Sequence, residues 1–161
     1  MYPDFSLGIQ YAAPAPELPR WRLRRWVGRA LGAALAAPDP RAGQPVALTL
    51  RLVDADEGKS LNAAWRQRDY ATNVLTFEYG ADPSGLISGD IVLCVPVLRQ
   101  EAAEHGKTLR QHAAHLVTHG VLHALGYDHI EPDDATRMEA LETAILTAQG
   151  IPDPYGTFDQ T

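Results

Sequence analysis

The sequence has only one cysteine, Cys94, among 161 residues. A lone cysteine excludes an internal disulfide and any zinc site built from several thiolates. The fold must therefore be held together by hydrophobic burial, for which a 45% content of apolar residues is sufficient. We expect one ordinary domain over residues 1–161, compatible with a reducing compartment.

Long apolar runs are also lacking. No window of about 18 uncharged apolar residues occurs, and the longest candidate, Val27–Ala37, is interrupted by Arg29 and stopped by Pro38. The first residues do not show the basic stretch and apolar run that are typical of an export signal. These absences predict a protein with no membrane partner and no cleaved export signal.

The net charge of −6 disfavours nucleic acid as a partner, but the charge is unevenly distributed. Residues 1–75 contain ten Lys or Arg and seven Asp or Glu, whereas residues 76–161 contain four and thirteen. Four arginines, Arg20, Arg22, Arg24 and Arg25, lie beside Trp21 and Trp26. Such a cluster could bind phosphates or stacked bases, although a solvated helix face with inward tryptophans is the commoner interpretation.

Hydrophobic periodicity predicts strands in the first part of the chain and helices afterwards. We expect a final helix capped by Asp133 or Asp134, and Pro96 to mark the end of the last strand. The expected strands cover residues 46–54, 73–78 and 87–95, and the expected helices cover residues 20–36, 60–68 and 108–125. The pattern indicates an α+β fold, in which helices pack on a small mixed β-sheet. The helix over 108–125 is apolar on more than one side, so we expect it to be buried and central.

The same helix carries the clearest chemical signal, His119 and His123 in an HxxxH spacing. Residues four apart share one helix face, so both imidazoles can reach one zinc ion. Gly126 tolerates the left-handed conformation that turns the chain back, which brings His129 within reach as a third ligand. Three imidazoles and an open fourth position are typical of a catalytic zinc site.

Other interpretations of these histidines remain open. They could be three separate core or surface residues, although two unpaired imidazoles on an apolar helix would be costly. His115, four residues before His119, is a rival ligand that we interpret as a supporting or core residue. The spacing is similar to HExxHxxGxxH of zinc proteases, but Gly120 stands where that motif has its general base, so proteolysis by the usual route is disfavoured.

The stretch HGVLHALGYDH, residues 119–129, resembles the signature of the YbeY family of bacterial endoribonucleases, the rRNA maturation factors. Residues 61–77, LNAAWRQRDYATNVLTF, resemble a second family segment, LNxxYRxxDxxTNVLSF, with Trp65 and Thr76 as mild changes. Residues 89–92, GDIV, resemble a third. The matches cover roughly residues 50–130 in the family's order.

The resemblance implies a single-strand-specific endoribonuclease with one Zn²⁺ per chain. It implies processing of ribosomal RNA, notably the 3′ end of 16S rRNA, and a part in ribosome quality control. It also implies a cytoplasmic protein that works near the small ribosomal subunit.

Two further residues are candidates for catalysis. Arg66 could bind the scissile phosphate through its guanidinium, and the resemblance implies a functional role, but spacing alone favours a surface pair with Asp69. Asp128 could hold a ligand imidazole, move a proton or stabilise the turn. Asp90 could brace the site from the sheet or cap a strand end.

Two other functions compete with RNA cleavage. One is a zinc hydrolase that acts on a peptide or other amide, and the other is a non-catalytic ribosome-binding protein with structural zinc. An RNA substrate predicts that Arg66, and with it the Arg20–Arg25 cluster, lies at the rim of the zinc cleft. It also predicts that Glu139 and Glu142 face away from the cleft.

Overall fold

The computed structural model describes residues 5–68, 70–128 and 130–155. Within them the predicted α+β class is confirmed, with a four-stranded sheet and five helices. In chain order the elements are β1 (Phe5–Tyr11), α1 (Arg20–Ala34), β2 (Val46–Val53), α2 (Ala55–Arg66), β3 (Val74–Ala81), β4 (Ile87–Cys94), α3 (Val95–Glu104), α4 (Leu109–Ala124) and α5 (Pro132–Thr147).

The sheet is mixed, as predicted, and has the strand order β1-β2-β4-β3. Strands β1, β2 and β4 run parallel, whereas β3 pairs with β4 in the antiparallel direction. The alternating leucines of β2, Leu48, Leu50 and Leu52, are all buried in the main core, which is the face expected from the sequence.

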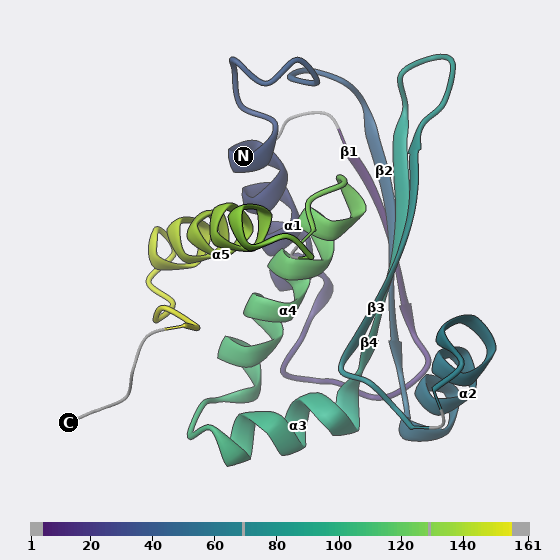
Figure 1. Cartoon of the computed structure of the whole chain (residues 1–161). Helices are drawn as coiled ribbons and strands as arrows, with labels where there is room; N and C mark the ends of the chain where they lie inside the picture. The colour runs from purple at the N-terminus through teal and green to yellow at the C-terminus, as the bar shows by residue number, and fades with distance from the viewer. Residues whose placement is uncertain (1–4, 69, 129, 156–161) are drawn as a thin grey trace.

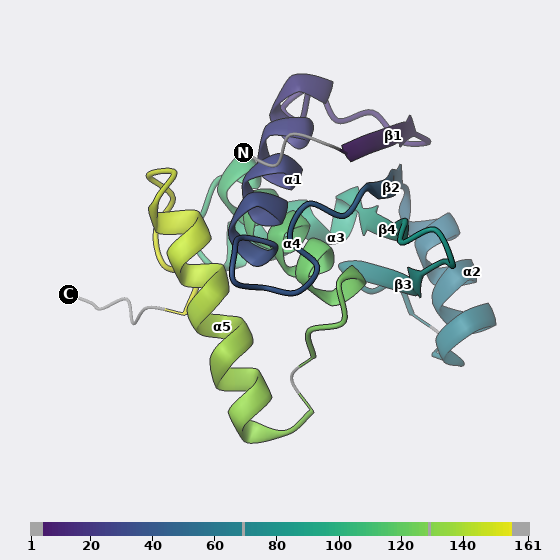
Figure 2. The same ribbon diagram turned by 90° about the horizontal axis from the view of Figure 1, so that it is seen from above.

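Three helices lie on one side of the sheet, with α5 packed on α1 and α4. Figures 1 and 2 show α1, α4 and α5 on this face and α2 on the other. Helix α4 contacts α1, α3, α5, β3 and β4, so it is the central helix that the sequence predicts. Among the described residues no helix is both long and apolar enough to cross a membrane.

Two glycines let α4 lie directly on β4. A Cβ atom at Gly120 of α4 would come within 2.8 Å of Cγ2 of Ile91. A Cβ atom at Gly89 of β4 would come within 3.0 Å of Cβ of Ala124. Real Cβ atoms essentially never approach within 3.0 Å, so a larger residue at Gly120 must push helix and strand apart, and at Gly89 the neighbouring atoms must give way by a few tenths of an ångström.

The structure corrects several predicted boundaries. Strand β1 and helix α3 were not expected. Strand β4 ends just before Pro96, as predicted, and Pro96 lies in the first turn of α3, where proline is well tolerated. Helix α2 begins earlier because the Asp54 side chain accepts a hydrogen bond from the Glu57 amide at 2.8 Å. Helix α5 is preceded by Glu131, so Asp133 and Asp134 lie in its first turn and do not cap it.

Candidate active site

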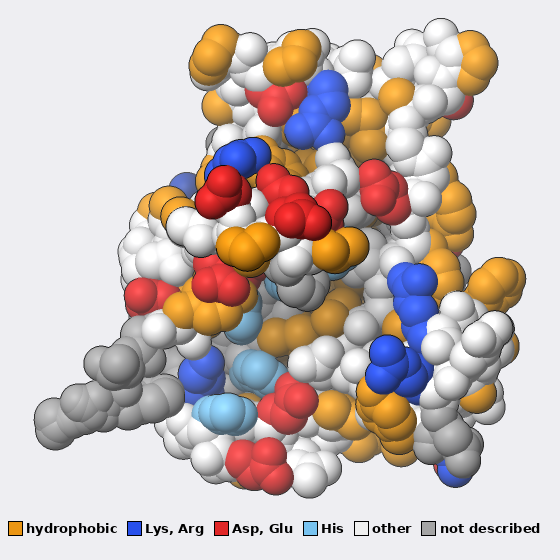
Figure 3. Space-filling view, in the orientation of Figure 1, with side chains coloured by type: hydrophobic (Ala, Val, Ile, Leu, Met, Phe, Trp, Pro, Cys, Tyr) orange, Lys and Arg blue, Asp and Glu red, His pale blue; other side chains and the backbone are white. Residues whose placement is uncertain are grey.

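Helix α4 presents four histidines along one face. His112, His115, His119 and His123 are spaced three or four residues apart, so their rings follow one another along the helix. Successive ring centroids lie 6.3, 6.3 and 5.3 Å apart. Figure 3 shows histidine side chains gathered in a hollow, with basic side chains on the side where α2 lies.

His119 and His123 line a cavity of about 420 Å³ together with Arg66. The rest of the cavity wall is formed by the start of β3 and the residue before it, that is by Asn73, Val74, Leu75 and Thr76. The fold therefore brings the predicted phosphate-binding arginine to two of the three predicted metal ligands. The third, His129, lies outside the described residues.

Arg66 is the last residue of α2 and is held against β3. Its Nη2 atom donates a hydrogen bond to the Thr76 carbonyl oxygen at 2.9 Å, and its guanidinium carbon lies 5.7 Å from the centre of the Phe77 ring. Arg66 is exposed, and these contacts hold its side chain against the cavity wall. Asp69, the alternative partner considered for Arg66, is not among the described residues.

The position of Glu142 of α5 differs from the one expected from the sequence. It was expected to face away from the site, but its side chain is completely buried behind the histidines. Its carboxylate contacts His119 Nδ1 at 2.8 Å and His115 Nε2 at 3.0 Å, and it accepts a hydrogen bond from the Tyr155 hydroxyl at 2.6 Å. Glu139, one turn earlier, is exposed, as predicted.

The charge state of Glu142 determines how His119 is protonated. Burial alone raises the pKa of this carboxyl, but the hydrogen bonds from His115, His119 and Tyr155 outweigh burial and lower the pKa to about 2. An ionised carboxylate can only accept, so His119 must carry its proton on Nδ1. His119 is then oriented so that Nε2 is the atom through which it would bind a metal.

A signal for Glu142 was present in the sequence. Met138 and Ile145, which lie four residues before and three residues after it, form the buried face of α5. An acidic residue on that face must find partners in the interior, because an unpaired buried charge is very costly. The five histidines of residues 105–123 were the obvious source of such partners.

A second carboxylate, that of Glu101, contacts His112. Glu101 of α3 contacts His112 Nε2 at 2.8 Å and accepts a hydrogen bond from Asn73 Nδ2 at 3.1 Å. Burial lowers the pKa of His112 below its usual value, and the Glu101 contact opposes this effect only in part. Asn73 therefore connects the cavity wall to α3.

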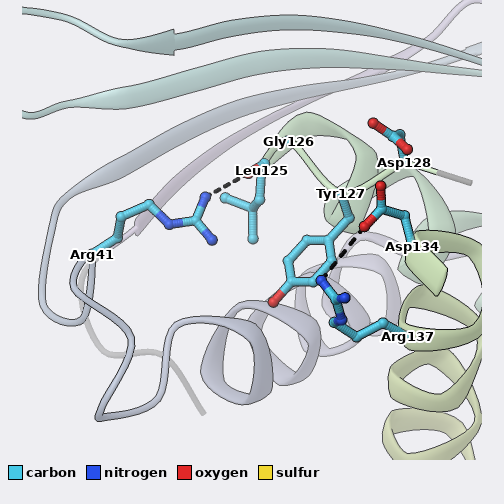
Figure 4. Close-up of a pocket in the computed structure, with 7 residues that line it drawn as sticks. All are labelled: Arg41, Leu125, Gly126, Tyr127, Asp128, Asp134 and Arg137. Carbon is cyan, nitrogen blue, oxygen red and sulfur yellow. Dashed lines mark hydrogen bonds and ion pairs between the residues drawn. The ribbon is translucent and has the colours of Figure 1, made fainter. Parts of the chain in front are cut away.

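Asp128 lies on the other side of the turn that ends α4. Gly126 in that turn has a φ of +97°, as its predicted role requires. The Asp128 carboxylate accepts a hydrogen bond from the Ile130 amide at 3.2 Å. It lines a separate cavity, in which Arg41 reaches in from the opposite side and donates to the Leu125 carbonyl oxygen (Figure 4). Of the three roles considered for Asp128, turn stabilisation is the one that a contact among the described residues supports.

The structure supports neither of the two roles considered for Asp90, which were to brace the site and to cap a strand end. It lies in the middle of β4, next to Ile91, which faces α4, and successive strand residues point to opposite faces. Its carboxylate accepts a hydrogen bond from the Tyr79 hydroxyl at 2.8 Å. Asp90 therefore lies on the sheet face away from the histidines and caps no strand end.

The described residues alone do not form a complete metal site. In residues 5–68, 70–128 and 130–155, no three His, Cys, Asp or Glu side chains come together as a group that could hold a metal ion. His119 and His123 supply two imidazoles on one helix face, with ring centroids 5.3 Å apart. This arrangement fits a site to which His129 adds the third ligand.

The sequence is similar to those of known endoribonucleases. The family model described as endoribonuclease YbeY matches residues 11–150. An endoribonuclease YbeY from Bordetella petrii is 65% identical over 96% of this chain and 99% of its own length. Those from Bordetella pertussis and Thiobacillus denitrificans are 61% and 47% identical, also over 96% of this chain, and over 98% and 99% of their own lengths.

A solved structure shares the fold. The solution structure of a Thermotoga maritima protein matches with a TM-score of 0.58 over 96% of this chain and 99% of its own, at 21% identity. The family model covers strands β2, β3 and β4, the histidine-bearing helix and the Arg66 segment together. The chain therefore belongs to the endoribonuclease YbeY family.

Proposed function

We propose that this protein is a zinc-dependent endoribonuclease that hydrolyses phosphodiester bonds of single-stranded RNA. The observation that carries the proposal is the shared cavity of Arg66, His119 and His123. Among the described residues that line it, there is one permanently charged side chain, a cation, and no carboxylate. Such a wall suits an anionic substrate, because a guanidinium binds phosphate oxygens through two parallel hydrogen bonds.

Zinc would be held by His119 and His123 together with His129. The donor set fits, since Glu142 accepts a hydrogen bond from His119 in the carboxylate–histidine arrangement that is usual behind a metal ligand. When bound, zinc polarises a phosphoryl oxygen and lowers the pKa of a coordinated water towards neutrality. One zinc per chain is expected.

The chain's own residues position the substrate. Arg66 uses one N–H on the Thr76 carbonyl oxygen, and its remaining N–H groups are the ones that bind the scissile phosphate and the charge that develops there. Glu142 fixes the tautomer and ring orientation of His119. Both actions require rigid side chains, and both side chains are held by contacts to neighbouring elements.

Hydrolysis of a peptide or other amide is less well supported. The base of the zinc-protease motif would stand at Gly120, and the space beside Gly120 is filled by Ile91 of β4. A side chain at this position would point at the sheet and not into the cavity. The carboxylate that contacts His119, that of Glu142, is buried and takes part in three hydrogen bonds.

The family also supports a proposal for the biological substrate. We place the protein in the cytoplasm, where it processes ribosomal RNA at the 3′ end of 16S rRNA, contacts the small ribosomal subunit and takes part in ribosome quality control. The family is named for endoribonuclease activity, which supports RNA as the substrate.

The decisive experiment is cleavage of a single-stranded rRNA fragment by zinc-loaded protein, with and without chelator. Arg66→Ala should keep the fold and the zinc but lose about 100-fold or more in cleavage rate. Arg66→Lys should restore only part of the rate, because lysine lacks the planar fork. Arg68→Ala is the matched control, since Arg68 is exposed nearby but does not line the cavity. Wild-type cleavage by Arg66→Ala would remove this arginine from the mechanism.

Metal content tests the ligands separately. His123→Ala should bind zinc much more weakly than the wild type, whereas His115→Ala should lose less, because His115 contacts Glu142. Full zinc occupancy in the variant with all three predicted ligands changed to alanine would disprove the assignment.

A further inference from the structure

The arginine cluster at the start of α1 is divided between two sides of the helix. Arg20 and Arg24, one turn apart, turn towards β1. Arg20 donates a hydrogen bond to the Ile9 carbonyl oxygen at 3.0 Å, and the Arg24 guanidinium lies 4.3 Å from the centre of the Phe5 ring. These two arginines thus bind to β1 of the same chain. No arginine of the cluster lines the cavity of His119 and His123.

Arg22 and Arg25 point the other way, into a second cavity of about 280 Å³. Arg110, in the first turn of α4, lines the same cavity, so three guanidiniums from two helices converge there. The other described lining residues are Trp21, Trp26, Gln111, Gln149, Gly150 and Ile151. None of these residues is acidic.

The convergence is unfavourable for the protein alone. Burial and the nearby charge of Arg110 together lower the pKa of Arg22. The Nε atom of Arg22 is buried and has no hydrogen-bond partner among the described residues. A buried donor without a partner costs about 1–3 kcal/mol, and repulsion between like charges adds to the cost. An anion in the cavity would relieve both.

An aromatic surface borders the same cavity. Trp21 is 59% exposed, and the Arg22 guanidinium lies 4.7 Å from the centre of its ring. A stacked arginine and an exposed indole together offer a flat surface on which a nucleic-acid base can stack. An acidic peptide would use the arginines but would gain little from this surface, so the combination favours RNA.

We propose that the cavity of Arg22, Arg25 and Arg110 binds a backbone phosphate of single-stranded RNA while Trp21 stacks on an adjacent base. The inference depends on the proposed function only for the identity of the ligand. Arg110 precedes His119 by nine residues, or about 14 Å along the axis of α4 and half a turn around it. The cavity is therefore a second contact with a long RNA, apart from the site of cleavage.

The test measures equilibrium binding of a long, unstructured polyuridine RNA to the full chain carrying Arg66→Ala, at several salt concentrations. Arg25→Gln combined with Arg110→Gln should weaken binding about tenfold or more and reduce the salt slope by about one for each arginine removed. Trp21→Ala should weaken binding without changing the slope. Arg25 and Arg110 are exposed, so their replacement should not unfold the protein.

Arg29→Gln is the matched control, because Arg29 is an exposed arginine of the same helix that does not line this cavity. Equal affinity and slope for the control and the double variant would overturn the proposal. A double variant that loses affinity for a polyglutamate peptide but not for RNA would also overturn it, in favour of a protein ligand. Because binding is read without cleavage, an inactive wild-type enzyme would count against the proposed function and not against this site.

Discussion

Two glutamates support the histidine row of α4 from different helices and in different surroundings. Glu142 of α5 contacts His115, His119 and Tyr155, and its side chain is 0% exposed. Glu101 of α3 contacts His112 and Asn73, and its side chain is 31% exposed. The two carboxylates make similar hydrogen bonds, but only one of them retains access to water.

This difference determines what each glutamate contributes. A carboxylate without access to water depends entirely on its protein partners, and removal of Glu142 takes away the shared acceptor of two partly buried histidines and of Tyr155. Glu101 can exchange its partners for water at little cost. We therefore expect Glu142 to govern both folding and the geometry of the site, and Glu101 to adjust stability only slightly.

The largest effect is expected for Glu142→Ala. This substitution leaves a cavity and removes the partner of three polar groups, so the free energy of unfolding should fall by about 3–5 kcal/mol. The variant should also bind zinc about 10–100-fold more weakly, because His119 loses the group that orients it. Urea denaturation and zinc titration measure the two effects.

Glu139→Ala is the control for that experiment. Glu139 belongs to the same helix but is exposed, so its removal should change the free energy of unfolding by no more than about 0.5 kcal/mol. An equally small effect for Glu142→Ala would show that water can reach its partners, and the contrast with Glu101 would then disappear.

The next largest effect is expected for Gly120→Ala, on the side of α4 that packs against β4. Alanine favours a helix by about 1 kcal/mol, but its Cβ atom would meet Ile91 at 2.8 Å. Overpacking of this kind typically costs about 1–3 kcal/mol, so the net change should be destabilising. Chemical denaturation with and without Ile91→Ala gives a double-mutant cycle. If Ile91→Ala costs as much in the Gly120→Ala background as in the wild type, the two sites are independent and the clash is absent.

A smaller effect is expected for Glu101→Ala. The carboxylate is partly hydrated, so the loss of its contacts with His112 and Asn73 should lower the free energy of unfolding by about 1 kcal/mol. Glu104→Ala on the same helix is the control, since Glu104 is exposed. A loss for Glu101→Ala as large as that for Glu142→Ala would mean that burial is not what distinguishes the two glutamates.

The sequence was most informative where a local pattern decides the outcome. Helical periodicity and proline positions located α1 and α4, and alternation located β2. The spacing of His119 and His123, and the segment around Arg66, predicted which side chains share a cavity. The left-handed conformation of Gly126 also follows from local geometry, because a helix that ends and turns back commonly needs it.

Prediction failed where the outcome depends on residues far apart in the sequence. Glu142 was expected to face away from the cleft, and the partners that overturn this expectation lie 23 and 27 residues earlier, on another helix. The division of the arginine cluster could not be predicted either, because it depends on how β1 and α4 pack beside α1. The role of Gly120 as a contact with Ile91 likewise requires the sheet to be in place.

The smallest effect concerns the pH dependence that His112 confers on stability. The pKa of folded His112 is below the usual value of 6.5, because burial outweighs the attraction of Glu101, and the charges of His115 and Lys107 add to the lowering. Below about pH 6.5 the unfolded chain therefore binds more protons than the folded protein at this position. The free energy of unfolding should fall as the pH falls through this range, with a slope of at most about 1.4 kcal/mol per pH unit. Above pH 6.5 the contribution is complete and constant.

His112→Gln should flatten this slope, as measured by urea denaturation between pH 5 and pH 8. His105→Gln is the control, because its ring is exposed and stacks on His112 at 6.4 Å without sharing its burial. Combination of His112→Gln with Glu101→Ala separates the effect of burial on the pKa of His112 from the effect of the Glu101 carboxylate. Without Glu101 the pKa of His112 should fall further, since only the opposing effect is removed, so Glu101→Ala alone should steepen the slope. A slope that became shallower in Glu101→Ala would mean that the carboxylate, and not burial, dominates the titration of His112.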